Sequence, residues 1–206
     1  MNIIYFGIDI SVLLKNLKMF DKNQFNLKGK LLIAMPDIGD ERFKESVIII
    51  CDHNMYGSMG IVINSHDSSL NFKGILDELQ IQQSTNKIIN IQSGGPVESS
   101  RGFILHSNDY KIESTNFITE DIFLTASIEI IKDIACDKGP KNIKFTLGYA
   151  GWNAGQLEKE IQQNLWLHTS ARDSLVFSSN VDNIWSNSVK TLGIDISHLN
   201  HIPGHA

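Results

Sequence analysis

Cys51 and His53 stand two residues apart at the end of the apolar stretch that begins at Val47. Side chains of a strand alternate between its two faces, so the thiol and the imidazole can point the same way. An imidazole beside a thiol lowers the thiol pKa and makes a nucleophile or a redox sensor. In the other interpretation Cys51 continues a buried apolar stripe as a small hydrophobic residue. We favour packing, because a β-branched apolar strand runs directly into the cysteine.

Two glycine-rich segments offer backbone amides that can hold a ligand. In the first, Gly94 and Gly95 precede Pro96 and can form a turn whose amides bind an anion, with Arg101 adding positive charge. The segment matches neither a phosphate-binding P-loop nor a dinucleotide-binding fingerprint. A tight turn that needs glycine at positive φ explains the same residues.

The segment from Gly148 to Gln156 is the stronger candidate for a ligand pocket. We expect a strand to lead into a glycine turn and then into a helix N-terminus, an arrangement that leaves amide donors free. The candidate ligand-binding residues here are Gly148, Tyr149, Gly151, Trp152 and Gln156. In the alternative, Trp152 fills the core beneath the turn, since tryptophan side chains are usually largely buried.

The sequence contains no spacing typical of a zinc site and no catalytic triad order, so neither a metal nor a cofactor is expected. Asp37 and Asp40 lie close together, but they precede a predicted helical turn, where carboxylates serve as caps. His198, His201 and His205 belong to the C-terminal tail and show no helical periodicity, which favours a surface tail over a metal site.

The pattern of apolar residues predicts alternating strands and helices. Predicted strands cover residues 30–35, 47–51, 59–63, 102–106, 122–125, 144–149 and 175–177. Predicted helices begin near Phe72, Ser127, Asn153 and Asn180, and Asn153 with Gln156 resembles a capping box. This order lacks the regular rhythm of a doubly wound sheet. We expect an α+β (α/β) fold, a single compact domain with a mixed sheet flanked by helices and a complex topology.

The charge of the chain is acidic outside its first residues. The formal net charge is −5; residues 1–30 hold five lysines and two aspartates, a net +3, and residues 31–206 carry −8. DNA binding depends on lysines and arginines that neutralise phosphates. Lys138, Lys141 and Lys144 are the nearest thing to a basic group, and their surroundings predict a solvated loop. Direct DNA binding is therefore not expected.

Residues 1–26 are predicted to be an N-terminal extension. The apolar stretch at its start is interrupted by Gly7 and Asp9, and it is too short for a transmembrane helix. It lacks the cationic start and the small-residue cleavage site of a signal peptide. The alternative is an amphipathic surface anchor, since Lys15, Lys18 and Lys22 follow the apolar part.

The two cysteines, Cys51 and Cys136, are too few for a disulfide framework. Together with the lack of an export signal, this predicts free thiols and a cytoplasmic location.

The chain resembles the AlgH/YqgE-like family of bacterial proteins over residues 27–206. The resemblance rests on the segments KLLIAMPDIGDERFKESVIIICDHN, GSMGIVIN, SGGPVESSRGFILH, LGYAGWNAGQLEKEI and the terminal GHA. Residues 51–54 match the family's Cys-acid-His-Asn pattern at all four positions. The resemblance implies a single domain of complex αβ topology. It also brings a transcriptional-regulator label, although the family has no settled biochemical activity.

Two functions of different class follow from these observations. The first is a non-enzymatic cytoplasmic regulatory module that binds an unknown small molecule or protein, and the lack of a catalytic constellation favours it. The alternative is a thiol-based enzyme or redox sensor that uses Cys51 with His53 as its base. The exposure of the Cys51 thiol discriminates between them, because only an accessible thiol can react.

Overall fold

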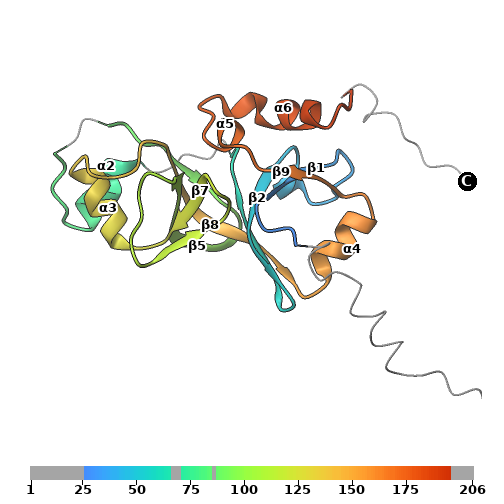
Figure 1. Ribbon diagram of the computed structural model, residues 1–206, viewed down its shortest axis with the longest axis horizontal. Coiled ribbons are helices and arrows are strands. Elements are labelled where there is room, and N and C mark those ends of the chain that lie inside the picture. The colour runs from blue at the N-terminus through green and yellow to red at the C-terminus, as the bar shows by residue number, and fades with distance from the viewer. Residues whose placement is uncertain (1–25, 66–70, 85–86, 196–206) are drawn as a thin grey trace, which may run out of the picture.

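The structure, a computed structural model, describes residues 26–65, 71–84 and 87–195. These residues form one domain, a curled sheet with helices packed against it (Figure 1). Residues 1–25 of the predicted extension and the three tail histidines lie outside the described residues. Among the residues that the structure describes, no helix has both the length and the apolar character needed to cross a membrane.

The described strands form a nine-stranded sheet in the order β6-β7-β5-β8-β3-β2-β1-β9, with β4 beside β8. Their bounds are β1 Lys30–Ala34, β2 Val47–Asn54, β3 Gly57–Val62, β4 Ile91–Ser93, β5 Val97–Ser107, β6 Thr115–Phe117, β7 Ile122–Thr125, β8 Ile143–Asn153 and β9 Trp166–Ser170. Neighbours are antiparallel, except that β4 runs parallel to β8. The predicted mixed sheet is thus an antiparallel sheet with one short parallel strand.

Five α-helices and two 3₁₀ helices accompany the sheet in the described part of the chain. They are η1 Glu41–Phe43, α2 Phe72–Glu78, α3 Ile128–Ala135, α4 Gln156–Gln162, α5 Asp173–Val176, η2 Val181–Asn183 and α6 Ile184–Thr191. Figure 1 shows α2 and α3 together at one end and α5 with α6 along one side, while α4 packs against β3, β8 and β9. The predicted strand at 175–177 is wrong: these residues belong to α5 and its end, because so short an apolar run fits either element.

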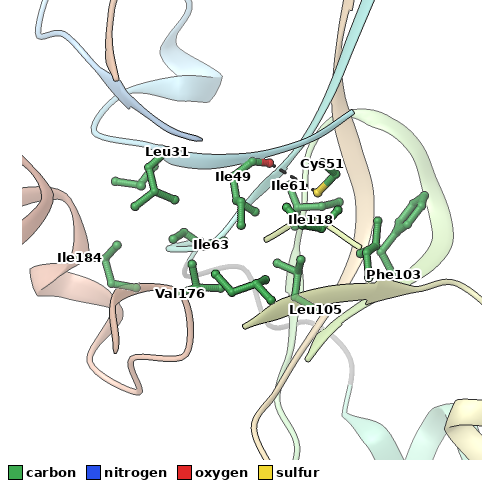
Figure 2. Packing of buried hydrophobic residues seen from close by; sticks show 13 residues of the cluster. Leu31, Ile49, Cys51, Ile61, Ile63, Phe103, Leu105, Ile118, Val176 and Ile184 are labelled. Atoms are coloured by element: carbon green, nitrogen blue, oxygen red, sulfur yellow. Dashed lines mark hydrogen bonds between the residues drawn. The ribbon is translucent and has the colours of Figure 1, made fainter. Parts of the chain in front are cut away.

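The surroundings of strand β2 explain why its sequence is continuously apolar. Val47 and Ile49 belong to one apolar cluster, which reaches β5, α5 and α6 (Figure 2). Ile48 and Ile50 belong to a second cluster on the opposite face, which contains Leu157 of α4. Both faces of the strand are therefore buried, as its sequence predicts. A third cluster packs α2 and α3 onto β5 and β8.

Strand β8 joins the two halves of the sheet (Figure 1). Its first half pairs with β5 on one edge and with β4 on the other, and its second half pairs with β3. The chain after β4 must therefore cross β8 to reach Val97, which pairs with Tyr149 on the β5 edge. Gly94 and Gly95 make this crossing: the Gly94 amide donates to Leu147 O (2.7 Å), and its carbonyl accepts from the Val62 amide (2.9 Å).

The crossing leaves no room for a side chain. A Cβ on Gly95 would overlap the backbone of Tyr149 and Ala150, and one on Gly148 would overlap the Gly95 carbonyl. Gly95 also has a φ of +146° and Gly148 a φ of +74°. Glycine is required here by the close approach of two backbones as well as by conformation.

We predict that Gly95→Ala lowers the free energy of unfolding by about 3 kcal/mol or more, because backbone atoms rather than a flexible side chain block the new methyl group. Gly155→Ala is the matched control: Gly155 has a φ of +74° but no atom within 4 Å of the added Cβ, so the loss is about 1 kcal/mol. Urea denaturation of both variants measures the difference. Equal losses would contradict the crossing as the reason for glycine.

Candidate functional site

Cys51 lies inside the first apolar cluster, among Ile49, Ile61 and Leu105 (Figure 2). Its side chain is buried, and the thiol donates a weak hydrogen bond to Ile49 O at 3.6 Å. Burial raises the pKa of the Cys51 thiol to about 12. The thiolate, which is the reactive form, is therefore disfavoured near neutral pH.

His53 does not lie on the same face as Cys51, so the thiol–imidazole pair of the alternative interpretation is not formed. The register of β2 on β3 shifts between Ile50, which pairs with Gly60, and Asp52, which pairs with Met59. Cys51 is the extra residue of this β-bulge, and the alternation of side chains is inverted beyond it. His53 accordingly faces α4.

The partners of His53 come from the turn side of the hairpin and from α4. Its Nδ1 lies 2.8 Å from Ser58 Oγ, and its Nε2 lies 3.7 Å from Glu158 Oε1. The side chain is 8% exposed. The imidazole thus links the β2–β3 hairpin to α4, which is a structural role with no contact to the thiol.

The first glycine segment does not form an open anion site with Arg101. Gly94 and Gly95 are buried in the crossing, and the Gly94 amide is already bound to Leu147 O. Arg101 is exposed, pairs with Glu98 at 3.0 Å and lies over the Phe103 ring at 5.2 Å. The close approach of the backbone of β8 explains why glycine stands at positions 94 and 95. This reason is conformational and steric, as in the tight-turn interpretation, and does not involve an anion.

The predicted turn after Gly148 is part of β8, which continues to Asn153. Gly148 is required by the close approach of the Gly95 carbonyl and by its own φ of +74°. Helix α4 begins at Gln156 with Gly155 as its N-cap, and Gln156 Oε1 accepts from the Asn153 amide at 3.0 Å. One half of the predicted capping box is therefore present. Tyr149 is half-buried and packs edge-on against Phe103 at 5.8 Å.

Glu160 of α4 holds two tryptophans at once. Its Oε2 accepts from the indole N–H of Trp152 and from that of Trp166, both at 2.8 Å, while Oε1 accepts from Gln156 Nε2 at 2.8 Å. The two indole rings meet edge to face, with centroids 6.0 Å apart, and Phe43 packs against Trp166 in the same way. Trp152 is 7% exposed, so it fills the core and also contributes to a surface hollow.

Two adjacent hollows lie along η1, and together we call them the η1 groove. The first has a volume of about 400 Å³ and the second about 330 Å³, and both are lined by Arg42, Phe43 and Pro96. Trp185 lines the first hollow, and Trp152 and Trp166 line the second, so all three tryptophans of the chain border the groove. Trp185 is anchored by its indole N–H, which donates to Ala34 O at 2.9 Å.

Of the candidate binding residues, the groove includes Gly95, Gly151, Trp152 and Gln156. Sequence reasoning missed Arg42, Phe43, Glu160, Trp166 and Trp185. The available signal was the scarcity of tryptophan itself, since three widely separated tryptophans on one surface must be brought there by the fold. Their proximity is a tertiary feature with no local motif.

The charged group at the centre of the groove is a neutralised pair. Asp40 accepts from the Arg42 amide at 3.1 Å, as predicted for a cap, and its carboxylate binds the Arg42 guanidinium at 2.7 Å. These hydrogen bonds hold the pKa of the Asp40 carboxyl below its usual range. No group of three or more His, Cys, Asp and Glu side chains suited to a metal ion occurs within the described ranges.

Lys144 lies in the strand predicted at 144–149, but it is buried rather than solvated, contrary to the expectation for the group of Lys138, Lys141 and Lys144. It lies in β8 and is 7% exposed, and its amine donates to Ile63 O at 2.7 Å and to Gln92 Oε1 at 3.4 Å. Burial lowers the pKa of the Lys144 amine to about 8. The lysine thus links β8 to β4 and to the residue that follows β3, at the point where the partner of β8 changes from β4 to β3.

We predict that native Cys51 resists alkylation by iodoacetamide at pH 8, whereas the exposed Cys136 is labelled. Each unit of raised pKa lowers the thiolate fraction about tenfold. His53→Ala should leave the rate at Cys51 unchanged, because the imidazole faces away from the thiol. Peptide mapping by mass spectrometry gives both rates. Fast labelling of Cys51 that disappears in His53→Ala would restore the thiol-based alternative.

We predict that stability rises with pH between about pH 8 and pH 9. The pKa of Lys144 is lowered from 10.5 to about 8, so in this window the unfolded chain binds more protons than the folded chain. The free energy of unfolding therefore rises as the pH rises. Above pH 9 the raised pKa of Cys51 opposes the effect, because unfolding then releases protons. The gain is on the order of 1 kcal/mol. Urea denaturation should show it in the wild type and not in Lys144→Met; equal slopes would refute the assignment.

Comparisons with known proteins agree on one family. The model of the AlgH-like family matches residues 31–197. A UPF0301 protein of Chelativorans sp. strain BNC1 is 45% identical over 188 residues, 87% of this chain and 93% of that protein. One from Bradyrhizobium sp. strain BTAi1 is 43% identical over 189 residues, 87% and 88% of the two chains.

Two solved structures share the fold. The solution structure of the AlgH protein from Pseudomonas aeruginosa matches with a TM-score of 0.71 and 35% identity, over 89% of this chain and 97% of that one. The crystal structure of DIP2367 from Corynebacterium diphtheriae matches with a TM-score of 0.69 and 17% identity, over 85% and 92% of the two chains, which shows the fold alone. The family model and the close relatives together establish that the chain belongs to the AlgH-like family.

Proposed function

We propose that this protein is a non-enzymatic, cytoplasmic binding module, and that its small-molecule or protein ligand lies in the η1 groove. The observation that carries the proposal is the gathering of all three tryptophans around two adjacent hollows. Ligand sites are typically concave and largely apolar, with a few polar groups that fix orientation. Tryptophan and arginine are also the residues that contribute most at protein interfaces.

The walls of the groove are held in place before any ligand arrives. Glu160 orients two indoles, Ala34 O orients the third, and Asp40 orients the Arg42 guanidinium. A preorganised site loses less conformational freedom on binding, which favours affinity. This rigidity supports recognition of a ligand.

A regulatory role fits the family's label, and we propose that it acts through the bound ligand or protein rather than through DNA. The net charge of −5 argues against direct contact with a phosphate backbone. The thiol chemistry is not proposed, because Cys51 is buried and His53 faces away from it.

Binding in the groove is tested by comparing the cellular ligands that the wild type retains with those that a variant with a blocked groove retains. Purified protein is incubated separately with the small-molecule and the peptide fractions of the native cell, and retained species are identified by mass spectrometry. We expect Arg42→Trp to obstruct the two adjacent hollows and to abolish retention. The Arg42 side chain is 66% exposed, and ion pairs at the surface contribute little to stability, so the variant should fold.

Lys190→Ala is the control, because this exposed residue of α6 is not among the groove residues. It should retain whatever the wild type retains. The proposal fails if the wild type retains nothing, or if retained species bind equally well to Arg42→Trp.

A further inference from the structure

Beyond Tyr149, strand β8 has a partner on one edge only. Residues Ala150 to Asn153 pair with β3, whereas on the opposite edge the pairing with β5 ends at Val97. Pro96 then leads the chain away towards the crossing. No strand among the described residues covers this edge after Tyr149.

The free edge is the one towards which the Gly151 peptide groups point. The Asn153 amide donates to the side chain of Gln156, so it faces away from β3. Residues two apart in a strand direct their N–H and C=O groups to the same edge. The N–H and C=O of Gly151 therefore point to the uncovered edge, and Gly151 itself is exposed. Such unpaired groups are a template for another strand.

Gly151 lies between two hollows on opposite faces of the sheet. On one face is the 330 Å³ end of the η1 groove, beside Trp152. On the other is a second hollow of about 450 Å³, bordered by Tyr56, Val97 and Tyr149, and Gly151 borders both. Tyr56 is 83% exposed at the tip of the β2–β3 hairpin. Alternate side chains of an added strand would enter the two hollows in turn.

The charges around this edge are unbalanced towards the negative. Asp40 and Arg42 neutralise each other. Asp52 borders the second hollow and Glu160 the groove, and neither has a lysine or arginine within ion-pair distance among the described residues. The two carboxylates lie on opposite sides of the edge and favour a basic ligand, whatever its sequence.

We propose that the edge of β8 at Gly151 binds an extended, basic polypeptide segment as an additional strand, with its alternate side chains in the two hollows. This inference rests on the proposed function, because one of the hollows is part of the η1 groove. Backbone hydrogen bonds to Gly151 give affinity, and the two hollows with their carboxylates give specificity.

The test uses the capped peptide acetyl-(Lys-Val)₃-amide with ¹⁵N-labelled full-length protein. We expect the amide resonances of Gly151 and Val97 to shift progressively as peptide is added. The acidic control of the same length and pattern, acetyl-(Glu-Val)₃-amide, should bind at least tenfold more weakly. An analogue N-methylated at alternate residues, prepared in both registers, should lose binding in the register whose amides face β8.

Gly151→Pro and Gly151→Ala form a matched pair of protein variants. Proline removes the edge-facing N–H without removing a ladder hydrogen bond, so Gly151→Pro should fold and bind at least tenfold more weakly. Alanine keeps the N–H, and its Cβ would meet side chains alone, the edge of the Tyr149 ring at 3.3 Å and a Val97 methyl group at 3.8 Å, so Gly151→Ala should bind.

Either of two results overturns the inference: no shift at Gly151 with the basic peptide, or equal binding of the N-methylated analogues in both registers. If Gly151→Pro does not fold, the N-methylated analogues decide, because they test the same hydrogen bonds from the peptide side. If the peptide experiments fail while Arg42→Trp still abolishes retention of a cellular ligand, the groove remains a binding site and only the addition of a strand at β8 is refuted.

Discussion

The passage of Gly94 and Gly95 across β8 is the constraint on which the rest of the structure depends. It lets one strand serve β4 and β3 on the same edge, because the chain leaves that edge over the backbone of β8 instead of around its end. A side chain at the crossing would separate the two backbones and with them the two halves of the sheet. The same crossing sets Pro96 beside η1, where it lines both hollows.

The groove and the core share the same side chains, so stability and recognition are coupled. Trp166 is 3% exposed and belongs to the second apolar cluster, yet it borders the groove. The carboxylate of Glu160 satisfies two indole N–H groups that would otherwise be left without partners. A binding wall built in this way resists rearrangement, because moving either ring breaks a hydrogen bond and opens the core.

Sequence reasoning was most successful where a pattern is local. The continuous apolar run of β2 identified a strand buried on both faces, and the spacing around Phe72 identified α2. It failed where the outcome depends on a distant partner. The buried position of Lys144 depends on Ile63 O and Gln92, and the glycine requirement at Gly148 depends on the crossing segment. Of the residues that border the groove, the sequence singled out Trp152 and Gln156 but not Trp166 and Trp185, because no motif connects those residues along the chain.

The bulge at Cys51 divides β2 into two parts in which side chains alternate with opposite parity. Before the bulge, odd-numbered residues face the first apolar cluster. After it, His53 faces α4, and Asp52 pairs with Met59. Deleting Cys51 would restore regular alternation along β2. The Asp52 carboxylate would then take the position of the thiol, among apolar side chains. The number of residues in this hairpin is therefore constrained as tightly as their identity, and a relative with a shorter β2 would need a different set of inward residues.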